Sequence, residues 1–352
     1  MSDQFVGTMP VQERHRFDVA RLEAYLREHV EDFKGPLEVE QFRGGQSNPT
    51  YLLTTPGARY VLRRKPPGKL LPSAHAVDRE YRVMTAVAKA GIPVARTYCL
   101  CQDDTVVGTA FYVMAYVEGR VLWDQALPGM SKAERAATYD ELGRVIAALH
   151  MVDYAAIGLG EFGKPGNYFA RQIGRWTSQY RASETEPIPA MDRLIDWLPR
   201  SIPPGDEITI VHGDYRLDNV IFHPTELRIL AVLDWELSTL GHPLADFSYH
   251  CLSWHIPPGH FRGIGGLDLE ALGIPTEAEY VRAYCRRTGR ARIEHWDFYL
   301  AYGLFRIAAI LQGIRKRAED GTAASEHAFD AGERAKPLAE MGWKYARRAG
   351  AA

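Results

Sequence analysis

The chain has 352 residues, of which 46% are hydrophobic and 24% charged, and its formal net charge at pH 7 is −2. This composition is that of an ordinary globular protein, and the length predicts two lobes rather than a single core. The near-neutral charge argues against a nucleic-acid or anionic-membrane partner, because the overall field would attract neither.

The first third of the chain alternates short strand patterns with two helical ones. Apolar residues at helical spacing predict a surface helix over 17–30, with Asp18 as its cap. A second helix is predicted over 74–90, with Glu80 on it. Alternating patterns predict strands over 37–42, 51–54, 59–63, 97–100 and 110–117. We therefore predict a small domain over residues 1–117.

The segment 43–50 (RGGQSNPT) joins the first two predicted strands as a hairpin loop. Gly45 allows the backbone N–H groups to approach an anion, and Ser47 and Asn48 add polar side chains. A plain hairpin turn has the same composition, so this loop alone does not identify a binding site.

The third predicted strand ends in the basic cluster Arg63, Arg64 and Lys65. A cation here and Glu80 on the following helix are the right types for an ion pair that positions phosphates. Successive strand side chains point to opposite faces, so Arg63 ranks ahead of Arg64, with Lys65 as a further alternative. The competing interpretation is that Arg63 and Glu80 are solvated surface charges.

After residue 117 the pattern becomes mainly helical, which predicts a second, larger lobe over residues 118–352. Ser131 and Glu134 form a capping box at the start of a helix over 131–150. Further helices are predicted over 168–181, 191–198, 277–288 and 293–317 and in the last thirty-odd residues. The most apolar long stretch, 298–314, contains Arg306, which favours a buried helix over a membrane span.

The stretch 210–236 carries the strongest chemical signal. Short strand patterns over 208–211, 220–222 and 229–233 bracket three polar residues, namely Asp214, Asn219 and Asp234. Two carboxylates and an amide suit Mg²⁺, with one carboxylate left to act as a base. The arrangement favours phosphoryl transfer.

In its order of motifs the chain resembles the aminoglycoside phosphotransferase and choline kinase-like branch of the protein-kinase-like fold. That resemblance is carried by HGDYRLDN, with Asp234 downstream. Similarity to the kinase-like domain fused to some acyl-CoA dehydrogenases, and to its free-standing bacterial relatives, is carried by GGQSNPTY, YVLRRKPPG, GKPGNYFARQIGRW and VLDWELSTLGHPLADFSYH. The resemblance implies an α+β bilobal fold, with a small antiparallel N-terminal lobe that has one key helix and a larger, mainly helical C-terminal lobe.

The resemblance also implies an ATP- and Mg²⁺-dependent phosphotransferase with an alcohol group as acceptor. In this pattern Asp214 accepts or orients the proton of the acceptor hydroxyl, and Asn219 and Asp234 hold Mg²⁺. Arg216 stabilises charge on the transferred phosphoryl group, or else forms a salt bridge to a neighbouring loop.

The nucleotide contacts implied by the resemblance come from Gly45, Ser47, Asn48, Arg63, Glu80, Met114, Ala115 and Val117. The first three cover the phosphates, and the backbone after Met114 faces the nucleobase. Arg63 departs from the family pattern, because most relatives have a lysine there. Arginine keeps the charge but has a different donor geometry.

For the acceptor, the resemblance implies a hydroxy acid or hydroxyacyl-CoA and a functional link to an acyl-CoA dehydrogenase. Arg171, Arg175 and Trp176 would suit an anionic or CoA-bearing substrate, although a solvated helix face fits them equally well. Glu236 has three open roles: metal ligand, base or structural partner. One alternative is an antibiotic kinase. The other is a pseudokinase or scaffold, and the departure at Arg63 favours this second alternative. A monomer or a homodimer is expected.

Two further groups are predicted to be structural. Asp246 is expected to support the catalytic loop rather than react. Histidines 242, 250, 255 and 260 match no helix-based zinc spacing, so they are expected in loops or the core. The four cysteines favour reduced thiols, and the N-terminus lacks a signal-peptide pattern, so a cytoplasmic protein is expected.

Overall fold

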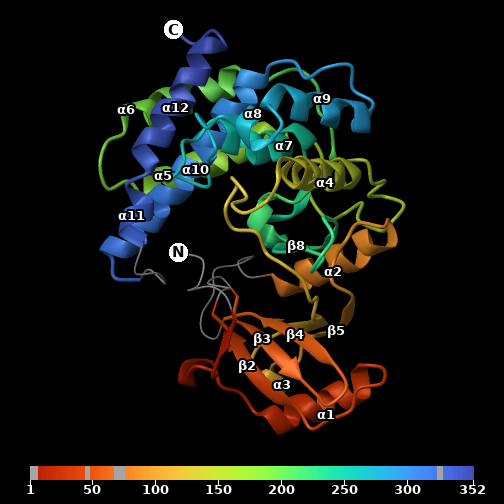
Figure 1. Cartoon of the computed structure of the whole chain (residues 1–352). Helices are drawn as coiled ribbons and strands as arrows, with labels where there is room; N and C mark the ends of the chain where they lie inside the picture. The colour runs from red at the N-terminus through yellow and green to blue at the C-terminus, as the bar shows by residue number, and fades with distance from the viewer. Residues whose placement is uncertain (1–6, 44–47, 67–75, 323–327) are drawn as a thin grey trace. The chain divides into compact units, whose positions relative to one another are not determined.

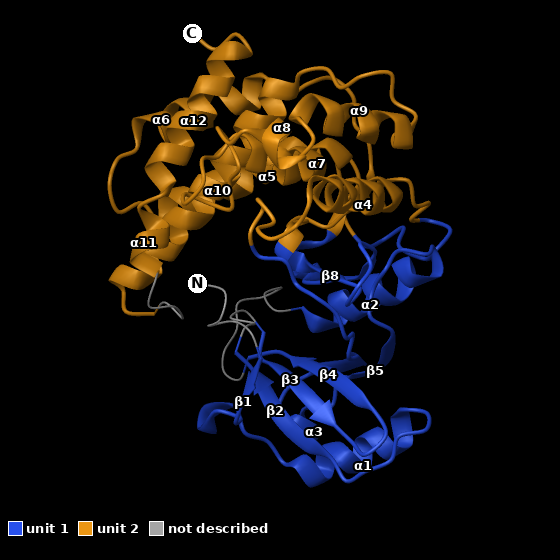
Figure 2. Ribbon diagram, in the orientation of Figure 1, with its two compact units in different colours: residues 1–123, 155–162, 218–238 blue, residues 124–154, 163–217, 239–352 orange. Residues whose placement is uncertain are grey.

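The computed structural model describes residues 7–43, 48–66, 76–322 and 328–352. The chain divides into two compact units (Figure 2). Unit 1 comprises residues 1–123, 155–162 and 218–238, and unit 2 comprises residues 124–154, 163–217 and 239–352. The segment 218–238, which sequence patterns grouped with the second lobe, therefore packs with the first unit. The α+β fold class is confirmed.

Unit 1 is built on a six-stranded antiparallel sheet in the order β1-β2-β3-β4-β6-β5. Figure 1 labels β2, β3, β4 and β5 of this sheet. Its strands are β1 (Thr8–Met9), β2 (Glu38–Phe42), β3 (Thr50–Thr54), β4 (Arg59–Arg64), β5 (Thr97–Cys101) and β6 (Phe111–Ala115). Its helices are η1 (Glu13–His15), α1 (Val19–His29), α2 (Val77–Lys89) and α3 (Asp104–Val107). The five predicted strands and both helices are present, whereas β1 is too short to show a pattern.

Alternation along β4 and β6 separates the core from the site. On one face, apolar side chains of both strands pack with α1: Tyr60, Leu62, Phe111 and Val113. Arg64 lies on that same face, where it is 2% exposed and donates to Tyr51 Oη and to the Val107 carbonyl. Arg63 and Tyr112 lie on the other face and meet Glu80 of α2. The two arginines therefore point to opposite faces, as predicted.

A hairpin of β8 (Val220–Phe222) and β9 (Ile229–Val232) is hydrogen-bonded to the rest of unit 1. Val232 N donates to the Pro93 carbonyl at 2.8 Å, and Arg120 and Phe222 exchange two backbone bonds of 2.8 Å. Gly119 permits this approach, because a Cβ there would lie 2.2 Å from the Phe222 carbonyl oxygen. Two short helical turns flank the hairpin, η3 (Leu217–Asn219) before it and η4 (Trp235–Leu237) after it. Because of these bonds, η4 and all of η3 except Leu217 belong to unit 1.

Unit 2 is mainly helical. Its elements are α4 (Lys132–His150), α5 (Tyr168–Ala182), α6 (Pro189–Trp197), η2 (Leu198–Arg200), β7 (Thr209–Val211), β10 (Thr239–Gly241), α7 (Pro243–Cys251), η5 (Leu252–Trp254), α8 (Leu269–Leu272), α9 (Glu277–Thr288), α10 (Trp296–Glu319), α11 (Ala328–Gly332) and α12 (Ala335–Arg348). The capping box of Ser131 and Glu134 is confirmed at the start of α4. The long helix α10 packs against α5, α7, α11 and α12, and β7 pairs antiparallel with β10.

Helix α7 was not predicted from the sequence, because Gly241 and Pro243 are residue types that usually interrupt a helix. Pro243 instead occupies the first turn, where a missing N–H costs nothing, and the His242 side chain accepts from Leu244 N at 3.2 Å. His242 and His250 are buried, as expected for core histidines. No group of three or more His, Cys, Asp or Glu suited to a metal occurs in the described part of the chain.

The apolar stretch predicted as a buried helix is the buried core of α10, in which residues 298–309 are all buried. Arg306 is buried with its neighbours and is 5% exposed. Among the described residues, no helix is long and apolar enough to cross a membrane. All four cysteines are free and buried.

Candidate active site

In unit 1, Arg63 contacts three carboxylates. Its Nε lies 2.9 Å from Glu80 Oε2, and its Nη2 lies 2.8 Å from Asp234 Oδ1 and 3.3 Å from Glu236 Oε2. The side chains of Arg63 and Glu80 are only 12% and 2% exposed. The alternative of two solvated surface charges is therefore excluded for this pair.

Glu80 is held by two further side chains. Asn48 Nδ2 donates to its Oε1 at 3.0 Å, and the Tyr112 hydroxyl donates to its Oε2 at 3.0 Å. Burial raises the pKa of Glu80, and the charge of Arg63 opposes that rise. Burial alone would lower the pKa of Arg63, but the negative charges of Glu80 and Asp234 outweigh it and raise that pKa. A guanidinium keeps its charge in proteins, and the carboxylate partners stabilise that charge in its buried position.

The structure describes only part of the hairpin loop over residues 43–50. Gly45 and Ser47 lie outside the described residues. Asn48 is fully buried, and its amide binds Glu80. Its side chain thus has a role in fixing the ion pair, which the sequence pattern did not suggest.

Asn219 and Asp234 flank the same end of the β8–β9 hairpin. Val220 pairs with Val232, and Leu233 N donates to the Asn219 carbonyl at 2.8 Å. Asp234 has a left-handed backbone, with φ 62° and ψ 64°, and its side chain is 34% exposed. Such a conformation is uncommon for aspartate and is typical of functional positions. The fold thus brings two oxygen-bearing side chains to one edge of unit 1.

Glu236 lies two residues beyond Asp234 and is 25% exposed. Trp235, between them, is buried and donates from Nε1 to the Val232 carbonyl at 3.0 Å, which anchors the turn. Of the three roles open for Glu236, the observed contact is that of an ion-pair partner to Arg63.

The segment predicted to face the nucleobase follows β6. Met114, Ala115 and Val117 are all half-buried. Ala115 N donates to the Arg96 carbonyl at 2.7 Å, so this donor is already used within the sheet. The strand ends at Ala115, which places Val117 in the irregular backbone beyond it.

In unit 2, Asp214 is held by Arg216, whose Nη2 lies 2.8 Å from Asp214 Oδ2, and by a hydrogen bond from the Tyr249 side chain. The predicted alternative for Arg216 was a salt bridge to a neighbouring loop, whereas the observed ion pair is with Asp214 on the same loop. Both side chains of the ion pair are 18% exposed. The carboxylate of Asp214 is therefore oriented within its own unit.

Asp246 supports the loop that carries Asp214. Its two carboxylate oxygens accept from His212 N at 2.7 Å and Gly213 N at 2.8 Å, and His150 Nε2 lies 3.3 Å away. Burial would raise the pKa of Asp246, but the hydrogen bond and charge of His150 lower it. This buried carboxylate fixes the backbone on the N-terminal side of Asp214, which confirms the predicted supporting role.

Arg306 is a site residue that sequence patterns missed. From α10 it donates through Nη2 to the Gly213 carbonyl at 2.5 Å, and its guanidinium lies 4.6 Å from the centre of the Tyr249 ring. In the sequence, Arg306 is a lone charge inside an apolar run. This pattern argued against a membrane span but did not indicate a role for Arg306 in the site. A buried cation with such partners is a positioning residue for the loop.

Replacing Arg306 with Met should destabilise the protein by about 1.5–3 kcal/mol, because the Gly213 carbonyl loses a charged donor while buried. Displacement of the loop should lower the turnover number by up to ~10²-fold. Chemical denaturation and steady-state kinetics measure the two effects. Arg317→Met, on an exposed position of the same helix, is the matched control. A fully active, equally stable Arg306→Met variant would contradict the positioning role.

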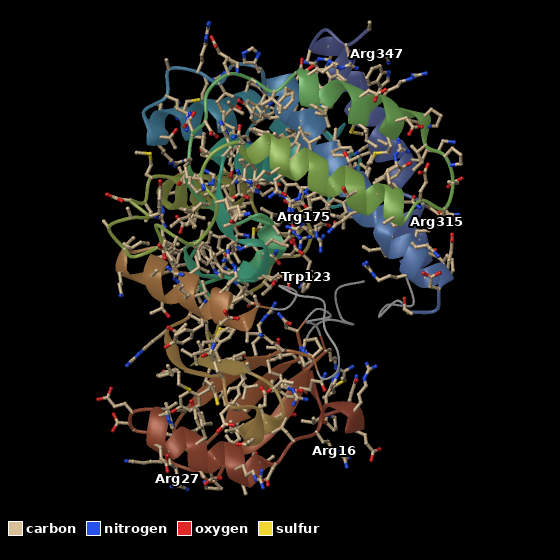
Figure 3. The ribbon with its side chains drawn as sticks, turned by 180° about the vertical axis from the view of Figure 1, so that it is seen from behind. Arg16, Arg27, Trp123, Arg175, Arg315 and Arg347 are labelled. Carbon is tan, nitrogen blue, oxygen red and sulfur yellow. The ribbon has the colours of Figure 1, made fainter. Side chains whose placement is uncertain are left out.

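The three residues predicted to bind the acceptor, Arg171, Arg175 and Trp176, all lie on α5. Arg175 is exposed on this helix (Figure 3), and Arg171 Nη2 donates to the Lys164 carbonyl at 2.7 Å. Trp176 is 7% exposed and packs beneath Arg306, with 5.5 Å between guanidinium and ring centre. Trp176 is therefore buried, and Arg175 also lies over its ring, with 5.5 Å between guanidinium and ring centre. The role of these three residues toward the acceptor stays a prediction.

Comparison with known proteins gives three consistent findings. Residues 38–301 match the family described as the phosphotransferase enzyme family. A putative aminoglycoside phosphotransferase from Ralstonia eutropha JMP134 is 65% identical, with a TM-score of 0.88 over 95% of this chain and 99% of that one. Mouse acyl-CoA dehydrogenase family member 10 is 47% identical over 347 residues, which are 98% of this chain but 32% of the relative. The chain thus spans about a third of that relative.

A more distant neighbour shows the fold alone. A thermostable mutant of an aminoglycoside phosphotransferase, solved as a ternary complex with AMP-PNP and hygromycin B, is 18% identical with a TM-score of 0.60. The match covers 92% of this chain and 98% of that one.

Proposed function

The chain belongs to the phosphotransferase enzyme family, and on that premise we propose that it transfers the γ-phosphoryl group of ATP to the hydroxyl of a small-molecule acceptor. The observation that carries this proposal is the Arg63 cluster, in which a buried ion pair with Glu80 lies beside Asp234. A guanidinium can bind phosphate oxygens bidentately, so Arg63 can serve in place of the lysine that the family resemblance implies.

The residues at the end of the β8–β9 hairpin fit a magnesium ion. Asn219 and Asp234 supply oxygen donors, and hard cations prefer such ligands. A bound Mg²⁺ would neutralise charge on the phosphates. Arg63 contacts Asp234 in this structure. With Mg²⁺ bound to Asp234, the nucleotide phosphates would replace this carboxylate as a partner of Arg63.

Asp214 accepts the proton of the acceptor hydroxyl, or orients that hydroxyl for attack. Arg216 and Tyr249 fix its carboxylate, while Asp246 and Arg306 fix the backbone beside it. Catalysis in this scheme consists of positioning and charge stabilisation, without a covalent intermediate.

We propose a hydroxy acid or a hydroxyacyl-CoA as the acceptor. The support is the similarity to a region of mouse acyl-CoA dehydrogenase family member 10. The same similarity supports a functional link to an acyl-CoA dehydrogenase. A screen of MgATP consumption across hydroxy acids, their CoA esters and aminoglycosides tests this choice. Consumption with aminoglycosides alone would contradict it.

A nucleotide-binding pseudokinase is the second candidate, favoured by the contact between Arg63 and the proposed metal ligand Asp234. It binds MgATP without transferring phosphate to any acceptor. Turnover that depends on Asp214 separates the enzyme from this alternative.

Replacing Asp234 with Ala should abolish Mg²⁺-dependent nucleotide binding. A ligand at a hundred times its Kd stabilises the native state by about 2.7 kcal/mol, so wild-type protein should melt several degrees higher with MgATP. The variant should show no such shift in a thermal melt. Glu226→Ala is a control on the same hairpin, where the side chain is exposed. A retained magnesium-dependent shift in Asp234→Ala would exclude Asp234 as the main metal ligand.

A further inference from the structure

Helix α2 is anchored through two arginines to segments of unit 1 that lie far from it in the sequence. Arg79 Nη2 donates to the Phe162 carbonyl at 2.7 Å, and the Arg79 guanidinium lies 4.2 Å from the centre of the Phe162 ring. The same Nη2 lies 3.5 Å from the Ser238 carbonyl. Three residues later, Arg82 Nη2 donates to the Gly158 carbonyl at 3.1 Å. Residues three apart share one side of a helix, so α2 has a side that binds backbone carbonyls.

The contacts of Arg79 tie α2 to the last residues of two segments of unit 1. Phe162 ends the segment 155–162, and Ser238 ends the segment 218–238. Because Phe162 is fully buried, its carbonyl has no access to water and needs a donor from the protein. Arg79 supplies a charged donor, which makes a stronger hydrogen bond than a neutral one. This contact therefore fixes α2 against both segments.

The contact with Ser238 bears on the Arg63 cluster. The three carboxylates of this cluster come from two places: α2 supplies one, and η4 with the residue before it supplies the other two. Ser238 is the residue that closes η4, and α2 packs against this turn. Arg79 therefore connects the two elements whose spacing decides whether all three carboxylates can reach one guanidinium.

Arg79 and Glu80 anchor α2 on two different sides. Adjacent residues of a helix point in directions about 100° apart, because the helix has 3.6 residues per turn. With Glu80 as the only anchor, α2 could roll about its axis and carry the carboxylate away from Arg63. The Glu80 side chain is 2% exposed, so such a roll would leave a buried charge without its cation. The second anchor limits α2 to the rotation in which the ion pair forms.

We propose that Arg79 is a positioning residue of the nucleotide site, which holds α2 in the rotation in which Glu80 orients Arg63 toward the ATP phosphates. The inference rests on the proposed function, because it takes Arg63 as the group that binds those phosphates. Arg79 acts through Glu80 and does not itself meet the nucleotide. The affinity for MgATP then depends on backbone contacts made outside the Arg63 cluster.

The test measures MgATP binding by isothermal titration on the full chain, well below the melting transitions of all variants. Arg79→Met should weaken binding roughly tenfold, because one charged hydrogen bond that orders the site is lost. Arg79→Lys should recover part of the loss, since an ammonium group can still donate to the Phe162 carbonyl. Lys89→Met, at an exposed position of the same helix, is the matched control and should bind as wild type does.

A double-mutant cycle separates positioning from a general loss of stability. If Arg79 acts through Glu80, Arg79→Met should cause little further loss of affinity in a Glu80→Gln background. Hydrogen–deuterium exchange gives a second measurement that needs no Glu80 variant. The backbone amides of α2 should exchange faster in Arg79→Met than in wild type or in Lys89→Met.

Unchanged MgATP affinity in Arg79→Met would overturn the positioning role and leave the proposed phosphoryl transfer intact. An equal loss of affinity in the wild-type and Glu80→Gln backgrounds would do the same, as would unchanged exchange of the α2 amides. Wild-type protein that binds no MgATP would contradict both the proposed function and this inference.

Discussion

Asp214→Asn is expected to lower phosphoryl transfer by roughly 10²–10⁴-fold, because the amide cannot accept the proton of the acceptor hydroxyl. The substitution keeps the shape of the side chain, so Arg216 and Tyr249 retain a partner of the same size. Binding of MgATP should change little, since the proposed nucleotide contacts come from other residues. Steady-state kinetics and a thermal melt with MgATP measure the two effects separately.

Asp192→Asn is a suitable control, because this carboxylate is 44% exposed on α6 and pairs with Arg181 in a surface contact. It should retain wild-type turnover. Full activity of Asp214→Asn with a verified acceptor would show that another group is the base. A parallel loss of nucleotide binding would instead indicate that the substitution disturbs the fold.

Arg63→Met is expected to destabilise unit 1 by about 3–5 kcal/mol, because it leaves the buried Glu80 carboxylate without its cation. The protein should also lose affinity for MgATP. Arg59→Met on the same strand is the matched control. Its partner Glu118 is 72% exposed, so the loss there should be under about 1 kcal/mol. Chemical denaturation of both variants measures the difference.

The loss of stability in Arg63→Met should depend on pH. Burial already raises the pKa of Glu80, and the charge of Arg63 is the largest effect that opposes this rise, ahead of the hydrogen bond from Tyr112. Without Arg63 the pKa of Glu80 rises further, so the folded state favours the protonated acid. Stability conferred by a raised pKa is present at low pH and lost as pH increases through the folded-state value. Arg63→Met should therefore lose more stability at pH 8 than at pH 5. An equal loss at both would contradict the assignment of Arg63 as the counter-ion of Glu80.

Local patterns were sufficient for much of the fold and for part of the site. The capping box of α4 follows from two residues three positions apart. The opposite orientations of Arg63 and Arg64 follow from the two-residue period of a strand. The pairing of Arg63 with Glu80 followed from residue type and the strand-to-helix order.

Other features depend on contacts between distant segments. The inclusion of 218–238 in unit 1 rests on backbone bonds to Pro93 and Arg120, which no local pattern contains. Arg306 is about ninety residues from the loop it holds, so no pattern of neighbouring residues indicated that it binds the Gly213 carbonyl. Trp176 shows the same dependence. Helical spacing placed it beside two arginines, and Arg175 does lie over its ring, but the spacing could not reveal the further contact with Arg306 of α10.

The central claim is that the γ-phosphoryl group of ATP moves to an acceptor hydroxyl beside Asp214. The most direct measurement uses ATP labelled with ¹⁸O in its γ-phosphoryl group, a hydroxy acid or its CoA thioester, and mass spectrometry of the acceptor. The account predicts an acceptor heavier by one labelled phosphoryl group with wild-type protein, and almost none with Asp214→Asn. Label found only in inorganic phosphate across hydroxy acids, thioesters and aminoglycosides, or transfer that is undiminished in Asp214→Asn, would contradict it.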